Sequence, residues 1–166
     1  ANGDTPITHE NVISLLAVSN ILYVGGIFKS VNGVPVKNLA ALDRKSGDLM
    51  RGWTPNPNGA VRCLAVSPEN PETIYIGGDF TQVGNVARKY LAGISVEGFT
   101  TTWDPDPNGE VLTLVAGSTL NHTPSGAELV PCFFAGGKFT QIRGIPRSYA
   151  AAIASQSAQV LSWQAS

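Results

Sequence analysis

Short apolar segments recur along this chain, and their hydrophobic pattern predicts β-strands rather than helices. Segments 12–18, 61–66 and 111–116 each alternate toward a two-residue period and are rich in β-branched residues. Length and composition of this kind are typical of strands. No apolar stripe with a 3.6-residue period and useful length occurs anywhere in the chain. The pattern therefore predicts an all-β fold.

A second kind of strand follows each of these segments and contains two adjacent glycines. It occupies residues 22–28, 74–80 and 133–139. Glycine removes the Cβ, so another backbone or an aromatic ring can approach closely, and the phenylalanine two residues later can fill that space. The spacing differs from G-x-G-x-x-G and no helix follows, so a nucleotide-binding loop is not expected. The residues predicted to form this repeated core are Gly25, Gly26, Phe28, Gly77, Gly78, Phe80, Gly136, Gly137 and Phe139.

Each unit continues with a third strand of small apolar residues and a fourth strand that ends in tryptophan. The third strands are predicted at 39–42, 91–94 and 150–153. The tryptophans, Trp53, Trp103 and Trp163, are 50 and 60 residues apart. This is about the length of a four-stranded propeller blade, a unit that must stack on its neighbours to bury its faces. The sequence thus predicts three four-stranded blades.

Proline-rich connectors with Asn-Gly turns separate the units. We assign residues 1–10 to the end of a preceding connector, 11–59 to blade one, 60–109 to blade two and 110–166 to blade three, all within one structural unit. Read tail to head, residues 163–166 and 1–3 match the connector 53–59, and Ala1 is expected to be a processed terminus. Propellers have roughly 4–8 blades, so three blades predict an incomplete propeller, completed by another chain or by a missing part of a longer chain.

The repeat as a whole resembles the bacterial delta-60 repeat, a β-propeller family of secreted and surface proteins. The resemblance lies in a Gly-Gly-x-Phe-Thr strand, an Arg-x-x-Leu/Ala strand and an aromatic-Pro connector that ends in Asn-Gly. The matching residues are 77–83 with Arg88 and Leu91, and 136–142 with Arg147 and Ala150. Blade one departs from it, with Lys29 in place of threonine and Val36 in place of the arginine. The resemblance implies a propeller outside the cell or on its surface and transfers no catalytic motif.

Composition excludes several partner classes. The net charge is −1 and only 14% of the 166 residues are charged, so neither nucleic acid nor an anionic membrane is expected as a partner. No apolar run approaches the ~20 residues that span a bilayer. Cys63 and Cys132 fit either one disulfide or two buried free thiols, and their apolar contexts favour the thiols.

Two arginines and one insertion are the candidate binding residues. Arg88 and Arg147 recur at one position of the repeat in a chain poor in basic residues. A structural bond to a neighbouring blade's carbonyls or carboxylate is the favoured interpretation, and ligand binding is the alternative. Residues 117–128 lengthen blade three and are expected to form a loop, either a tolerated surface variation or a binding loop. This insertion contains the N-glycosylation sequon that begins Asn121-His122.

A calcium site at Asp104, Asp106 and Asn108 is the weaker of two interpretations of the second connector. These residues imitate the start of an EF-hand loop, but position 12 of that loop would be Val115 rather than an acidic ligand. Because the first connector has no carboxylate, a rigid turn is favoured. No other metal site and no cofactor are expected.

No nucleophile elbow and no His-x-x-x-His motif occurs, so the sequence predicts a non-catalytic structural or adhesive propeller outside the cell that self-assembles or completes a ring with other blades. One alternative is an oligomeric lectin in which Trp53, Trp103 and Trp163 stack on sugars. A second is a secreted hydrolase with a site in the central channel. The partners expected are further blades and a glycan or surface protein.

Overall fold

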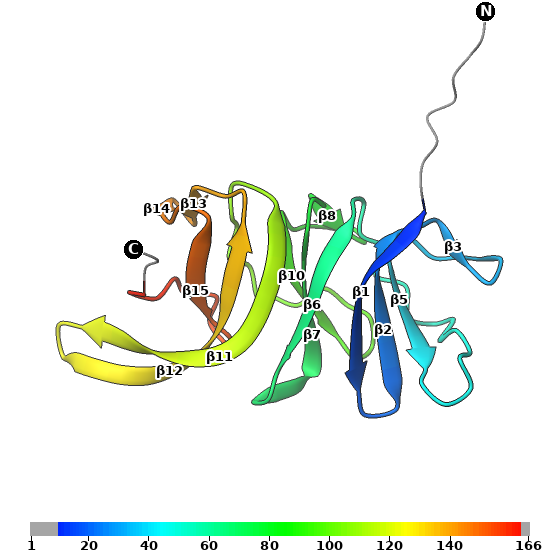
Figure 1. Ribbon diagram of the computed structural model, residues 1–166, viewed down its shortest axis with the longest axis horizontal. Helices are drawn as coiled ribbons and strands as arrows, with labels where there is room; N and C mark the ends of the chain where they lie inside the picture. Colours follow the sequence, from blue (N-terminus) through cyan, green and yellow to red (C-terminus); the bar gives the residue numbers. More distant parts are fainter. Residues whose placement is uncertain (1–9, 164–166) are drawn as a thin grey trace, which may run out of the picture.

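Three antiparallel β-sheets stand side by side in a row in the computed structural model, which describes residues 10–163 (Figure 1). The first sheet contains β1 (Asn11–Val18), β2 (Ile21–Ile27) and β5 (Leu39–Asp43). The second contains β6 (Val61–Ser67), β7 (Asn70–Gly78) and β10 (Leu91–Ser95). The third contains β11 (Val111–Thr123), β12 (Gly126–Gly137) and β15 (Ala150–Ala154). The predicted all-β fold is confirmed.

The fourth strand predicted in each sheet is reduced to a single β-bridge. The bridges join Leu42 to Leu49, Ile94 to Thr100 and Ile153 to Val160. Beyond the first two bridges the chain leaves the sheet, and Trp53 and Trp103 reach the next sheet. The prolines that follow these two tryptophans have no N–H for a ladder. Each sheet therefore has three strands rather than the four predicted.

Three short ribbons occupy the segments between the second and third main strands. They are β3 (Ser30–Val31) with β4 (Val34–Pro35), β8 (Gln82–Val83) with β9 (Val86–Ala87), and β13 (Gln141–Ile142) with β14 (Ile145–Pro146). The preceding connector clamps the ribbon of the next sheet. The Asn58 side-chain oxygen accepts hydrogen bonds from the backbone N–H groups of Thr81 and Gln82, at 2.8 and 3.0 Å. Asn108 makes the same pair of bonds to the third ribbon, which explains why asparagine ends each connector.

The paired glycines are required by two different close approaches. A Cβ on the second glycine, Gly78, would overlap the carbonyl oxygen of Ala60, which directly precedes the adjacent strand β6. A Cβ on the first glycine, Gly77, would lie 2.6 Å from the Cys63 sulfur and 2.8 Å from Cγ1 of Val111 in the third sheet. The sequence-based prediction that glycine admits a close approach here is confirmed.

The insertion in the third sheet is a continuation of two strands rather than a loop. Strands β11 and β12 pair without interruption from Thr113 and Gly136 to Thr123 and Gly126, and the hairpin projects well beyond the other two sheets (Figure 1). The prediction of a loop at residues 117–128 is wrong. Threonines on the strand and a glycine with a φ of 136° at the turn, Gly126, satisfy the local requirements of a hairpin.

Candidate functional site

Each sheet uses its two faces differently. The leading face is the one that the preceding sheet covers, and in the second sheet it includes Val61, Leu64 and Ile76. The trailing face is the one that covers the next sheet, and in the second sheet it includes Tyr75, Leu91 and Trp103. The first and second sheets therefore enclose one core, and the second and third sheets enclose another.

At each of these two interfaces, a tryptophan of one sheet donates a hydrogen bond to the next sheet. Trp53 packs on Tyr23 with ring centroids 5.2 Å apart, and its indole N–H donates to the carbonyl oxygen of Ser95 in the second sheet at 3.2 Å. Trp103 packs on Tyr75 and donates to the carbonyl oxygen of Ala154 in the third sheet at 3.0 Å. Both rings are almost fully buried. Neither offers a free face to a sugar, so these two rings do not support the lectin interpretation.

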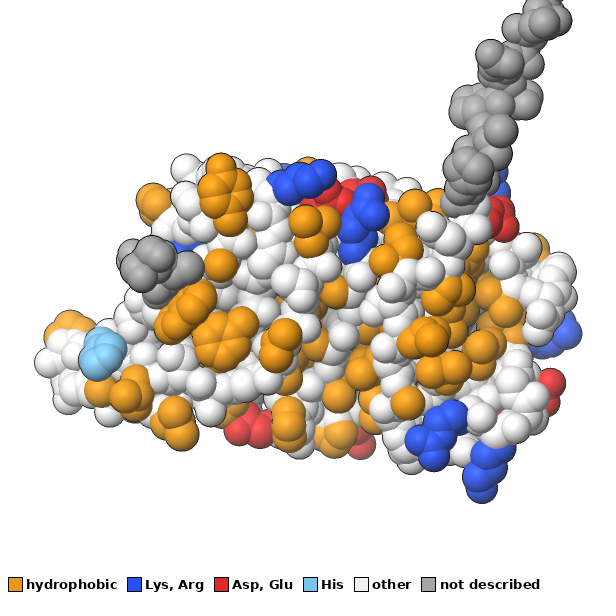
Figure 2. All heavy atoms as spheres, viewed as in Figure 1, with side chains coloured by type: hydrophobic (Ala, Val, Ile, Leu, Met, Phe, Trp, Pro, Cys, Tyr) orange, Lys and Arg blue, Asp and Glu red, His pale blue; other side chains and the backbone are white. Residues whose placement is uncertain are grey.

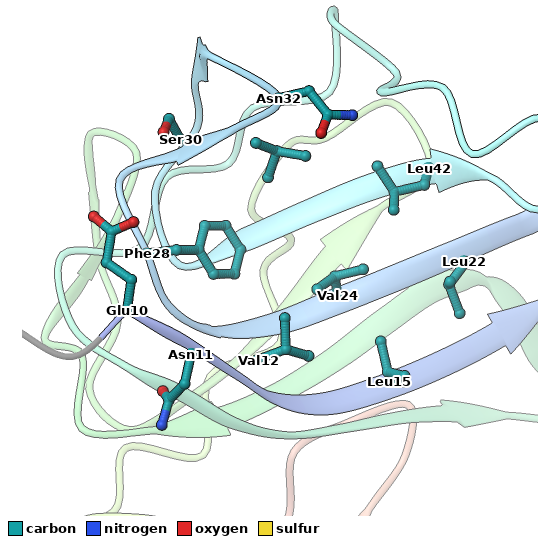
Figure 3. A pocket seen from close by; sticks show the side chains of 11 residues that line it. Glu10, Asn11, Val12, Leu15, Leu22, Val24, Phe28, Ser30, Asn32 and Leu42 are labelled. Carbon is teal, nitrogen blue, oxygen red and sulfur yellow. The ribbon is translucent and has the colours of Figure 1, made fainter.

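Within residues 10–163, no sheet covers the leading face of the first sheet, which is called uncovered below. Val12 and Leu15 are 56% and 60% exposed, whereas Val61 and Leu64 at the same register positions of the second sheet are 0% and 9% exposed. A hollow of about 660 Å³ lies on this face. Figure 3 shows Val12, Leu15, Leu22, Val24 and Leu42 gathered around it. The hollow is mainly apolar, because these are the residue types that fill the interior of the two enclosed interfaces, and Glu10, Asn11, Ser30 and Asn32 also line it.

The trailing face of the third sheet is uncovered in the same way. Val115 is 59% exposed, although Ala65 at the same position of the second sheet is 6% exposed. Phe134 and Trp163 pack on each other at 5.1 Å, as Tyr75 and Trp103 do, but both remain partly exposed. Hydrophobic side chains accordingly gather over the first and third sheets on the surface shown in Figure 2. These two uncovered faces are the candidate functional site.

Arg88 and Arg147 are engaged within their own sheets. The Arg88 guanidinium donates to the carbonyl oxygens of Ala87 and Thr101, at 2.8 and 2.9 Å, and lies 3.5 Å from the Asp104 carboxylate. Arg147 donates in the same way to the carbonyl oxygens of Pro146 and Leu161. These bonds tie each ribbon to the segment near the tryptophan. The favoured structural interpretation named a neighbouring blade's groups, whereas the partners belong to the same unit.

Asn121 and His122 lie on the projecting hairpin. The Asn121 side chain is 8% exposed, and its oxygen accepts a hydrogen bond from the backbone N–H of Ser162 at 3.0 Å. The backbone N–H of His122 donates to the Ser162 hydroxyl. These two hydrogen bonds hold the segment around Ser162 against the hairpin.

The three residues of the calcium interpretation make separate contacts. Asp104 faces Arg88, and the side-chain oxygen of Asn108 accepts two backbone hydrogen bonds. The backbone carbonyl oxygen of Asp106 accepts a hydrogen bond from the backbone N–H of Arg143 at 3.2 Å. Within residues 10–163 there is no group of three or more His, Cys, Asp or Glu side chains that could hold a metal ion. The same part of the chain contains no helix long and apolar enough to cross a membrane.

Charged groups cluster at one edge of the second interface. The Arg62 guanidinium pairs with the Glu110 carboxylate across the two sheets, and the Lys138 ammonium lies 2.9 Å from the same carboxylate. The hydrogen bond from Lys138, followed by that from Arg62, holds the pKa of Glu110 below its ordinary value despite partial burial. Glu110 is thus a carboxylate shared by two cations, and the pair with Arg62 joins the two sheets.

The two cysteines are buried free thiols, as the apolar pattern around them predicts. Burial raises the pKa of Cys63 to about 12 and also raises the pKa of Cys132. Neither thiol is therefore poised as a nucleophile.

Comparisons with protein-family models, with curated proteins and with solved structures find no match. The uncovered faces were not identified by sequence reasoning as particular residues. Their apolar positions look the same as the buried ones, since Val12, Val61 and Val111 are the same residue type at one register position. The expected match between residues 164–166 and 1–3 lies outside the described residues.

Proposed function

We propose that this protein is a non-catalytic structural or adhesive β-propeller protein that acts outside the cell. In this proposal the three sheets are blades, and the two uncovered faces join further blades. One observation carries the proposal: residues that are buried at both internal interfaces are exposed at the two ends of the row. Exposed apolar surface of this kind is a binding surface in a soluble protein or a liability for aggregation.

The arrangement of the strands supports the blade interpretation. Strands β6 and β11 lie next to one another, and β6 also lies next to β1, so the first strands of the three sheets are neighbours. Each sheet is a local antiparallel meander that stacks face to face on the next, as blades do around a channel. The resemblance of the repeat to delta-60 sequences adds support for this architecture and for a location outside the cell.

A tandem protein tests the proposal. Two copies of the chain are joined in one polypeptide, so that the trailing face of the first copy can meet the leading face of the second. If the faces are blade surfaces, the tandem protein is a compact monomer with a higher unfolding midpoint than the single chain diluted until it is monomeric. Per copy, the tandem protein also binds less of a hydrophobic dye such as ANS, which reports exposed apolar surface, than the monomeric single chain does. A midpoint and a dye binding per copy that both equal those of the monomeric single chain contradict the proposal.

The location is tested separately on intact cells that produce the protein. A membrane-impermeant amine-reactive biotin reagent should label it, because surface lysines such as Lys138 are exposed. A cytoplasmic protein serves as the unlabelled control. Labelling that appears only after lysis contradicts a location outside the cell.

A further inference from the structure

We infer that a second copy of this chain covers the uncovered faces, so that two chains close one ring of six sheets. This inference rests on the proposed function, which does not say which molecule supplies the further blades. The trailing face of the third sheet would meet the leading face of the first sheet in the other chain, and the reverse contact would close the ring. Both contacts would repeat the interface that the chain already makes twice within itself.

The first line of evidence is a valine that fits over a glycine. A Cβ on Gly25 would lie 2.7 Å from Cγ1 of Val61, and a Cβ on Gly77 would lie 2.8 Å from Cγ1 of Val111. In both internal interfaces the valine of the next sheet thus occupies the space that glycine leaves. On the third sheet, Gly136 has the same register position, and the nearest atoms to its added Cβ belong to its own sheet. The exposed valine at the matching position is Val12.

The second line of evidence is the tryptophan hydrogen bond. Trp53 donates to the carbonyl oxygen of Ser95, and Trp103 donates to that of Ala154. Ser95 and Ala154 hold the same register position at the end of the third strand of their sheets, and Asp43 holds it in the first sheet. The indole N–H of Trp163 therefore has a matching acceptor in the Asp43 carbonyl oxygen of the second copy.

The ion pair of the second internal interface has no counterpart in the new contact. The second internal interface joins Arg62 of one sheet to Glu110 of the next. At the corresponding positions of the uncovered faces, the third sheet has Leu112 and the first sheet has Asn11. The new interface would thus bury no unpaired charge at these two positions, and the one charged residue that lines the hollow is Glu10.

The number of copies follows from closure. A leading face on a trailing face is a head-to-tail contact, which forms a ring only if the rotation closes. Residues 10–163 of each copy form three main sheets, and propeller rings contain roughly 4–8 blades, so the six sheets of two copies are the one multiple of three in this range.

The experiment measures the particle mass of the single chain by light scattering after size exclusion, over a range of protein concentrations. We expect a particle of twice the chain mass of 17.4 kDa. Leu15→Lys alters only the leading face, and Val115→Glu alters only the trailing face, at residues that are 60% and 59% exposed in the chain. Each variant should lose the dimer at concentrations where the unmodified chain is dimeric. Phe99→Lys, at a residue that is 73% exposed in the turn after β10, is the matched control and should remain dimeric.

The outcomes separate the alternatives. A dimer that is lost with Leu15→Lys but kept with Val115→Glu indicates contact between two leading faces, and this result overturns the inference. Growth of the single chain into an open filament also overturns it. The double variant Leu15→Lys/Val115→Glu should recover part of the dimer, because opposite charges then lie in the same interface. A stable 17.4 kDa monomer also overturns the inference. If the single chain is a monomer but the tandem protein forms a compact monomer, the proposed function stands and the inference of a two-chain ring is wrong. If the tandem protein also fails to become compact, both the inference and the proposed function are wrong.

Discussion

Replacing Trp103 by alanine tests whether the interfaces between sheets, rather than the sheets themselves, hold this protein together. The ring is 5% exposed and lies 4.9 Å from the Tyr75 ring and 6.0 Å from the Phe133 ring. Removing a buried aromatic side chain costs roughly 3–5 kcal/mol of unfolding free energy. The carbonyl oxygen of Ala154 also loses its indole donor, so we expect a loss near the upper end, about 4–5 kcal/mol. That is a large share of the ~5–15 kcal/mol that stabilises a typical domain.

Urea denaturation followed by far-UV circular dichroism measures this loss at one fixed protein concentration. Trp103→Phe keeps most of the packing and loses the indole hydrogen bond, so it should cost less, about 1–2 kcal/mol. Phe99→Ala alters an exposed ring and should stay within ~0.5 kcal/mol of the unmodified chain. A loss below ~1 kcal/mol for Trp103→Ala would refute the reasoning, because the interface would then contribute little.

Three further predictions concern single groups. Gly78→Ala places a Cβ against a backbone carbonyl oxygen and should lower the free energy of unfolding by ~1–3 kcal/mol or more, measured by thermal or urea unfolding. Gly52→Ala has nothing within 4 Å of the added Cβ and should be nearly neutral, so equal effects of the two substitutions contradict this account. The hydrogen bond from Lys138 lowers the pKa of Glu110 in the folded protein. The Glu110 carboxylate therefore stabilises the folded protein fully at pH values above the pKa of Glu110 in the unfolded chain. This stabilisation is lost as the pH falls through the pKa of Glu110 in the folded protein. The difference in unfolding free energy between the unmodified chain and Glu110→Gln should therefore shrink on acidification, and a constant difference would show that the carboxylate charge is not responsible. Since the pKa of Cys63 is raised to about 12, this thiol should react with Ellman's reagent at mildly alkaline pH only after denaturation; rapid reaction of both thiols in native buffer contradicts its burial.

Sequence reasoning succeeded where a periodic pattern has one physical solution. The alternation in segment 61–66 and the paired Gly77 and Gly78 predicted strands and a close approach, and the structure contains both. A strand with apolar side chains on both of its faces must lie between two other sheets, so the face-to-face packing of the sheets was also predictable from the pattern.

Other features depend on contacts that no local pattern encodes. Tyr90 and Tyr149 adopt φ values of 65° and 67°, a region that favours glycine and asparagine, because the turn after each ribbon requires it. The Asn58 clamp joins residues more than twenty positions apart, at Thr81 and Gln82. Exposure was the least predictable feature, since Val12 differs from Val61 only in lacking a sheet in front of it.

The local pairing of the strands has a consequence for how such a chain changes over generations. Every ladder of hydrogen bonds in the three main sheets joins strands of the same repeat, as β6, β7 and β10 do in the second sheet. A recombination event that duplicates or deletes one whole repeat therefore leaves every ladder intact and alters only the number of places where sheets meet. The gene can thus change the number of stacked sheets in whole-repeat steps, with no intermediate that breaks a sheet.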